Sequence, residues 1–122
     1  MLVGGQRLQP SSTNGITSPN FFAPTVLSSV PPDAQLADEE TFGPVAALIP
    51  FSSEEEVISL ANDTVYGLAA YLFSTDVGRV WRVAEKLEVG MVGTNTGLIS
   101  QAVIPFGGVK ESGLGEIYFY DH

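Results

Sequence analysis

The residues best suited to contact a ligand lie in a short motif at residues 39–44, which reads Glu-Glu-Thr-Phe-Gly-Pro. A carboxylate such as that of Glu40 can accept hydrogen bonds from the two hydroxyls of a ribose, and the ring of Phe42 can pack against a flat heterocycle. The Gly-Pro pair that follows favours a turn. Composition alone favours a plainer interpretation, which is a solvated acidic turn with a phenylalanine in the core. The motif therefore gains weight only together with a second one.

A second motif occupies residues 105–113 and reads Pro-Phe-Gly-Gly-Val-Lys-Glu-Ser-Gly. Adjacent glycines allow close approaches that a Cβ would forbid, so the chain can fold tightly beside a ligand with Phe106 as an aromatic wall. In isolation, a glycine-rich turn with a buried ring is an equal alternative. A phosphate-binding loop is excluded, because Leu114 follows Gly113 where a lysine and a hydroxyl would be needed. We expect Lys110 to supply a surface charge or an ion pair.

A polar loop at residues 94–100 lies between the two motifs and follows a short apolar run. Open α/β sheets place their ligands at loops that follow strand ends. Other chemistry is closed off, because the chain contains no cysteine and its single histidine, His122, is the last residue. Disulfides, thiolate metal sites and thiol nucleophiles are therefore excluded. We expect neither a metal site nor a catalytic residue in this chain.

From about residue 20 to residue 115, the order of these segments resembles the C-terminal part of the NAD(P)-dependent aldehyde dehydrogenases. Both motifs flank the substrate and the nicotinamide in that family. The resemblance implies that Glu40 contacts the nicotinamide ribose and that Phe42 packs near the nicotinamide. It also implies that Phe106 lines the substrate tunnel.

The loop sequence Asn-Thr-Gly-Leu-Ile-Ser at residues 95–100 is most similar to succinate-semialdehyde dehydrogenases. In those enzymes Ser100 would hydrogen-bond the carboxylate of the substrate. A loop serine is more often a turn residue, so that alternative stays beside the first. None of Arg7, Arg79 and Arg82 matches the arginines that would balance this carboxylate, and the last two are expected on a solvated helix face.

The family's dinucleotide-binding domain, oxyanion-hole asparagine, general-base glutamate and nucleophilic cysteine all precede the region that this chain resembles. No thiohemiacetal can form here, and neither Glu39 nor Glu40 replaces a thiol, because a carboxylate is a poor nucleophile toward an aldehyde. We therefore expect a fragment, inactive alone, of an enzyme that oxidises an aldehyde to the carboxylic acid with NAD or NADP. The substrate implied is succinate semialdehyde, with another aliphatic aldehyde or semialdehyde as the alternative. Residues 116–122 align with nothing in the family, which puts its oligomer-forming strand in doubt.

The order of the predicted strands and helices that must position these residues indicates an α/β fold. By the resemblance, this fold is part of the aldehyde dehydrogenase catalytic domain, with a mostly parallel sheet and flanking helices. Strands are predicted in the apolar runs at residues 45–51, 68–73 and 91–94. The first two are nearly unbroken, as in strands covered on both faces. An earlier run at residues 21–27 contains Pro24, which favours an edge or the first residue of a strand.

A first helix is predicted to begin after Ser53, because Glu56 lies three residues further on and completes a capping box. Its expected buried stripe is Val57, Leu60 and Ala61. A second helix is predicted to begin at Thr75 or Asp76 and to end near Gly90 in a left-handed cap. Apolar residues recur along it at three- and four-residue spacing, at Val77, Val80, Trp81, Ala84 and Leu87.

Composition limits the partners. The chain has 122 residues, 44% of them hydrophobic, and a net charge of −9, so it repels nucleic acid and anionic lipid. No apolar run approaches the roughly 20 residues needed to cross a bilayer, and no signal peptide opens the chain. We expect a soluble, cytoplasmic protein, with a mitochondrial location left open. The expected partners are a small-molecule aldehyde and further dehydrogenase subunits, in homo- or hetero-oligomers.

Three segments are predicted. Residues 1–30 form loops and short extended pieces, residues 31–104 the α/β part of the catalytic domain, and residues 105–122 the glycine-rich active-site segment and a divergent tail. An alternative function is a non-catalytic interaction module, or truncated paralogue, that docks on a full-length subunit. The apolar aromatic tail at residues 117–120 suggests this function, because exposed apolar patches are usually buried against a partner.

Overall fold

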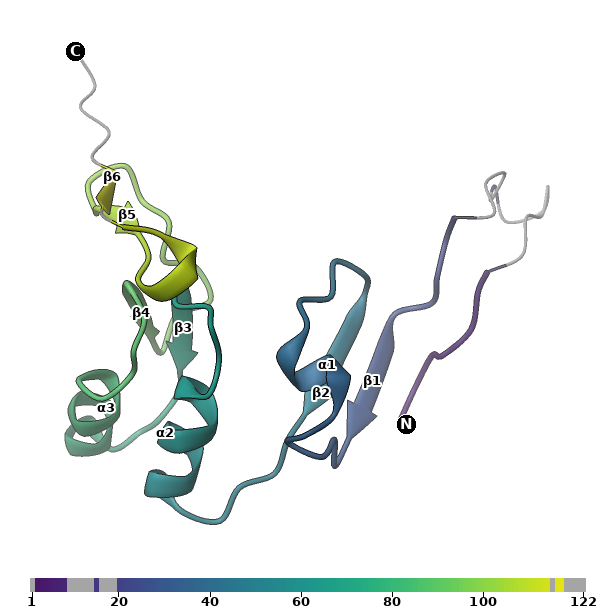
Figure 1. Cartoon of the computed structure of the whole chain (residues 1–122), viewed down its shortest axis with the longest axis horizontal. Helices are drawn as coiled ribbons and strands as arrows, with labels where there is room; N and C mark the ends of the chain where they lie inside the picture. The colour runs from purple at the N-terminus through teal and green to yellow at the C-terminus, as the bar shows by residue number, and fades with distance from the viewer. Residues whose placement is uncertain (1, 9–14, 16–19, 115, 118–122) are drawn as a thin grey trace. The chain divides into compact units, whose positions relative to one another are not determined.

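The computed structural model describes residues 2–8, 15, 20–114 and 116–117, and it has the α/β composition expected (Figure 1). The chain divides into two compact units, Met1–Phe51 and Ser52–His122. The division falls inside residues 31–104, which the sequence analysis treats as one segment. The three-segment division itself stays a prediction, and each unit is described by itself.

The first unit is built on two parallel strands, β1 (Thr25–Ser28) and β2 (Val45–Leu48), which pair along their whole length. The short helix α1 (Gln35–Asp38) lies between them in the chain. β1 begins at Thr25, one residue after Pro24, which the sequence predicted on an edge or as a strand's first residue; a proline has no N–H to donate to a ladder. Two isolated antiparallel bridges join described residues before β1 to Val26 and Phe22, namely Val3 with Val26 and Arg7 with Phe22.

The second unit contains a parallel pair, β3 (Ala69–Leu72) and β4 (Met91–Thr94). The helix α2 (Glu54–Asn62) precedes β3, and α3 (Val77–Ala84) connects the two strands. This order confirms the predicted alternation of strands and helices. The glycine-rich motif follows as β5 (Phe106–Gly107), the 3-10 turn η1 (Lys110–Ser112) and β6 (Glu116–Ile117), with β5 and β6 antiparallel.

The α2 start is capped as predicted. The Ser53 hydroxyl accepts a hydrogen bond from the Glu56 N–H at 3.1 Å, while the Glu56 carboxylate accepts from the N–H of Ser52 at 2.7 Å. The return bond of the capping box is thus displaced by one residue. No residue of α2 is fully buried, so the predicted stripe is only half-buried at Val57 and Leu60, and Ala61 is exposed.

Asp76 caps α3, since its carboxylate accepts from the Arg79 N–H at 3.0 Å. The predicted stripe is wrong in part, because Val77 is 70% exposed and Trp81 66%, whereas the buried residue is Val83. Three- and four-residue spacing identifies an apolar face but not how much of it a neighbour covers.

The left-handed cap predicted at Gly90 is also wrong. α3 ends at Ala84, and its C-cap residue Glu85 is right-handed helical. Gly90 is absent from the residues with positive φ. Residue 90 has to be a glycine because its backbone lies close to that of Gly107. A Cβ at this position would collide with the Gly107 carbonyl oxygen.

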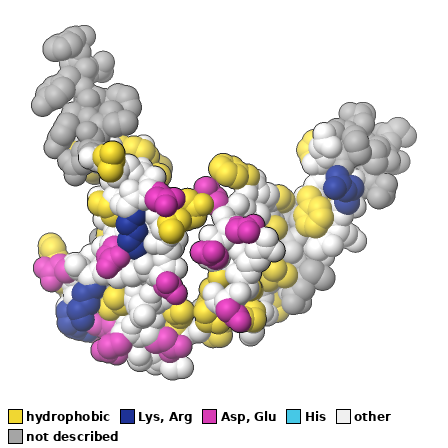
Figure 2. Space-filling model, viewed as in Figure 1, with side chains coloured by type: hydrophobic (Ala, Val, Ile, Leu, Met, Phe, Trp, Pro, Cys, Tyr) yellow, Lys and Arg dark blue, Asp and Glu magenta, His cyan; other side chains and the backbone are white. Residues whose placement is uncertain are grey.

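The two apolar runs predicted as strands covered on both faces are not covered within this chain. Leu48 of β2 is 50% exposed and Tyr71 of β3 is 49% exposed. Among the described residues the buried hydrophobic side chains are Val30, Val83 and Met91. Figure 2 accordingly shows hydrophobic side chains over the surface. Sheets of two strands have too few neighbours in this chain to cover both faces.

Candidate functional site

The first candidate motif forms the connection between α1 and β2. Glu39 is committed to the end of the helix: its N–H donates to the Gln35 carbonyl at 2.8 Å, and its carboxylate accepts from the Gln35 amide at 2.9 Å. Glu40 is exposed, and Phe42 is 93% exposed. The Glu39 carboxylate thus has a partner within the helix, and Glu40 is the glutamate that the resemblance assigns to the ribose.

The loop fits the group that its motif suggests. A carboxylate acceptor and an aromatic ring lie two positions apart on one exposed connection, and they suit a ribose diol and a flat heterocycle. The alternative of a phenylalanine in the core does not hold in this chain, because the Phe42 ring is almost fully exposed.

In the second candidate motif, glycines allow the backbone to pack closely against other parts of the chain. Phe106 is half-buried on β5, whereas Gly107 and Gly108 are buried. A Cβ at Gly90 would meet the Gly108 Cα at 2.8 Å, and one at Gly108 would meet the Ser112 Cβ at 2.9 Å. The predicted close approach is therefore found, and its partner is another stretch of the same backbone.

Gly67 is the centre of the hydrogen bonds that hold this motif. Its carbonyl accepts from the N–H groups of Gly90 and Val109, both at 2.9 Å, and its own N–H donates to the Ser112 hydroxyl at 2.9 Å. A Cβ at Gly67 would meet the Val109 carbonyl oxygen at 2.9 Å. The sequence gives no signal for this role of Gly67, since Gly90, Val109 and Ser112 lie far along the chain.

A cavity of about 430 Å³ lies beside β4 and the loop that follows it. Its polar lining comes from Thr94, Thr96 and Gln101, with Leu98 and Ile104 among the apolar residues. Ser100 is exposed and does not line the cavity, nor does Phe106. The position of the cavity after a parallel strand is where the sequence predicted ligand contacts, but the side chains that line it were not singled out.

Asn95 fixes the start of this loop. It adopts a left-handed backbone with φ of 54°, and its side-chain amide both accepts from the Ser74 N–H and donates to the Ser74 carbonyl, each at 2.9 Å. The loops that follow β3 and β4 are therefore joined. Asparagine tolerates the left-handed region, and this was the available sequence signal.

Charged groups link the two helices of the second unit. Glu54 binds Arg82 at 3.0 Å and Arg79 at 3.4 Å, and both arginines are more than half exposed, as predicted. The hydrogen bond from Arg82 lowers the pKa of Glu54 and raises the pKa of Arg82. The hydrogen bond from the Arg79 backbone lowers the pKa of Asp76.

Within the described part of the chain, no helix combines the length and the apolar composition that a membrane-spanning segment requires. No group of three or more His, Cys, Asp or Glu side chains is placed there to hold a metal ion.

Comparison with known proteins defines the class. Residues 1–121 match the model of the aldehyde dehydrogenase family. The chain belongs to that family. The match also includes residues 1–19 and 116–121, which the sequence resemblance left outside, so the tail is not foreign to the family.

The most informative relatives are semialdehyde dehydrogenases. A glutarate-semialdehyde dehydrogenase of Pseudomonas putida is 62% identical over 96 residues, covering 79% of this chain and 20% of the relative. A succinate-semialdehyde dehydrogenase [NADP(+)] of Escherichia coli is 58% identical, with the same coverage. A crystal structure of succinate-semialdehyde dehydrogenase from Burkholderia pseudomallei has a TM-score of 0.81 at 59% identity, over 93% of this chain and 23% of that one. The chain thus spans about a fifth of the length of the curated relatives it matches.

Proposed function

We propose that these residues form part of the active site of an NAD(P)-dependent aldehyde dehydrogenase whose substrate is a semialdehyde that carries a carboxylate. Succinate semialdehyde is the first candidate, because the loop at residues 95–100 resembles that of succinate-semialdehyde dehydrogenases. Glutarate semialdehyde is the second, because relatives named for the two substrates are about equally similar to this chain. The observation that carries the proposal is the exposed pair Glu40 and Phe42 on one connection, in a chain of this family.

Each candidate residue has a distinct role in this proposal. Glu40 would accept hydrogen bonds from the nicotinamide ribose, and the Phe42 ring would pack beside the nicotinamide. Phe106 would form a wall for the aldehyde, and Ser100 would donate to the substrate carboxylate. A bound nicotinamide dinucleotide would supply the hydride acceptor.

The nucleophile has to come from outside these 122 residues, because they contain no cysteine. We therefore expect the purified chain to produce no reduced dinucleotide when it is mixed with succinate semialdehyde and NAD or NADP. Absorbance of the reduced dinucleotide measures this. Reproducible aldehyde-dependent reduction would show that the expectation is wrong.

A chimeric enzyme tests the positive part of the proposal. The matching segment of the Escherichia coli relative is replaced by this chain, and oxidation of succinate and glutarate semialdehydes is measured with each dinucleotide. We expect activity with at least one of the two semialdehydes. A folded chimera that oxidises neither, while the parent enzyme does, would contradict the proposal.

A second candidate function is the interaction module, in which the chain docks on a full-length dehydrogenase subunit. Residues 118–122 of the tail that suggested it lie outside the described residues. The exposed side chains Phe73, Val77 and Trp81 of the second unit favour it instead. Co-purification of the chain with a full-length dehydrogenase would support it, and a monomer that captures none would count against it.

A further inference from the structure

We propose that Lys110 is a positioning residue, which fastens the segment that carries Phe106 to the end of α2. The proposal rests on the proposed function only for the role of Phe106 as a substrate wall. The contacts of Lys110 lie wholly within the second unit and among described residues.

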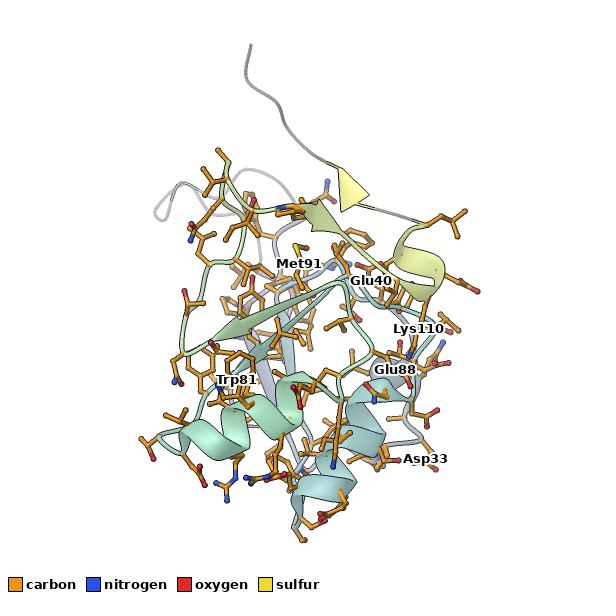
Figure 3. The ribbon with its side chains drawn as sticks, turned by 90° about the vertical axis from the view of Figure 1, so that its left-hand side faces the viewer. Asp33, Glu40, Trp81, Glu88, Met91 and Lys110 are labelled. Carbon is orange, nitrogen blue, oxygen red and sulfur yellow. The ribbon has the colours of Figure 1, made fainter. Side chains whose placement is uncertain are left out.

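All three donors of the Lys110 ammonium are used. The Nζ atom donates to the carbonyl oxygen of Asn62 at 2.7 Å and to that of Thr64 at 3.0 Å. It also forms an ion pair with the Glu88 carboxylate at 2.8 Å, as the sequence predicted for this lysine (Figure 3). The Lys110 side chain is only 22% exposed. A lysine that merely carried surface charge would not be held from three directions.

The acceptors are themselves fixed to one another. The Asn62 side chain donates to the Lys86 carbonyl at 2.8 Å and accepts from the Glu88 N–H at 2.9 Å. Three segments distant in sequence therefore meet at the ammonium: the end of α2, the connection from α3 to β4, and η1. Displacement of Lys110 removes the contacts of η1 with Asn62, Thr64 and Glu88, while those of Glu111 and Ser112 with Val65 and Gly67 remain.

The backbone conformation of Lys110 also supports a positioning role for its side chain. Its φ is 54°, in the left-handed region where glycine is the usual residue. The flanking N–H groups are engaged, with Val109 donating to Gly67 at 2.9 Å and Glu111 donating to Val65 at 3.0 Å. A lysine where glycine would be less strained indicates that the side chain is needed at this position.

This anchor controls Phe106 through a short, tightly packed link. Only Gly107, Gly108 and Val109 separate Phe106 from Lys110, and the two glycines leave no side chains to pack. Gly107 and Gly108 are buried against Gly90 and Ser112, so this short link passes a displacement of Lys110 on to Phe106. Lys110 therefore acts together with the packed glycines to position the Phe106 ring.

The test compares backbone amide hydrogen exchange in the full chain and in four variants. Lys110→Met removes the ammonium and keeps the length of the side chain, whereas Lys110→Arg keeps a charged donor. Lys110→Gly relieves the left-handed backbone but has no side chain. Lys86→Met is the matched control, since Lys86 is exposed and only its carbonyl takes part in the network.

We expect exchange at the Val109 and Glu111 amides to become at least about tenfold faster in Lys110→Met and Lys110→Gly, with β3 and β4 amides nearly unchanged. Lys110→Arg should restore part of the protection, and Lys86→Met should resemble the parent chain. The proposal is overturned if Lys110→Gly is as protected as the parent, because the backbone conformation alone would then explain the residue. It is also overturned if exchange rises equally in β3 and β4, since Lys110 would then hold the whole unit. These readouts need no enzyme activity, so an inactive chimera would refute the proposed function and leave this result standing.

Discussion

Adjacent residues of the same type differ in this protein because their partners differ. The Glu39 carboxylate accepts from Gln35 at the end of α1, whereas Glu40 and Phe42 are exposed on the connection that follows. The carboxylate available to a ligand is therefore that of Glu40. Glycines differ in the same way. At some positions a Cβ would collide with neighbouring atoms, and at others nothing lies near the place that a Cβ would take.

The glutamate pair supplies the first residue-scale prediction. In the chimeric enzyme, Glu40→Gln should raise the KM for the dinucleotide about tenfold, because hydrogen bonds to a charged acceptor are lost. Glu39→Gln is the matched control and should leave this KM within about twofold, since the Glu39 carboxylate accepts a hydrogen bond from Gln35 within its own helix end. Steady-state kinetics at saturating aldehyde measures both. Equal effects of the two variants would contradict the assignment.

Gly90 supplies the second residue-scale prediction. Gly90→Ala should destabilise the second unit by about 1–3 kcal/mol, because the new Cβ has to displace the backbone of Gly107 and Gly108. Gly97→Ala is the control, since nothing lies within 4 Å of a Cβ built there. Urea unfolding of the chain compares them. If both variants unfold at the same urea concentration, the close approach is not a constraint.

At the scale of elements, short polar contacts define the helices and join them. Ser53 and Asp76 each accept from a backbone N–H in the first turn of α2 and α3. Such local contacts can be read from sequence, because the accepting cap side chain and the backbone N–H that donates to it are three residues apart. The Glu54 contacts with Arg79 and Arg82 link the two helices and cannot be read in that way, since they join positions 25 and 28 residues apart.

These contacts predict how stability depends on pH. The pKa of Glu54 is lowered by Arg82, so the contact stabilises the folded chain above the ordinary value of 4.5 and is lost as pH falls through the lower, folded pKa. Asp76 acts in the same direction below its ordinary value of 3.8. Urea unfolding midpoints should therefore fall on acidification below about pH 4.5.

Glu54→Gln should reduce this acid dependence. The neighbouring Glu55→Gln is the control, because Glu55 forms no ion pair with a described residue. If Glu54→Gln and the parent chain lose stability equally between pH 6 and pH 3, the link between α2 and α3 contributes nothing to the acid response.

At the scale of the whole chain, the buried core is small. No side chain among the described residues is less than 2% exposed, and large apolar side chains such as Phe42, Val77 and Trp81 face solvent. Exposed apolar surface of this kind binds apolar dyes and partner surfaces. The net charge of −9 opposes association between copies.

We therefore expect the purified chain to bind an apolar fluorescent dye more strongly, per residue, than the full-length Escherichia coli relative does. Dye fluorescence at matched mass concentration measures this. Dye binding no stronger than that of the relative would show that the exposed side chains are covered in solution, and the oligomeric state would then have to be measured.

The sequence by itself determined the alternation of strands and helices from β2 to β4, because helix caps and apolar runs depend on neighbours within a few residues. It also identified the two motifs and the family they belong to. The tertiary structure alone decided that Gly90 serves a close approach and that Lys110 binds the end of α2. Each of these depends on a partner far along the chain, such as Asn62, which lies 48 residues from Lys110. Local pattern carries no information about such partners, because only folding brings them together.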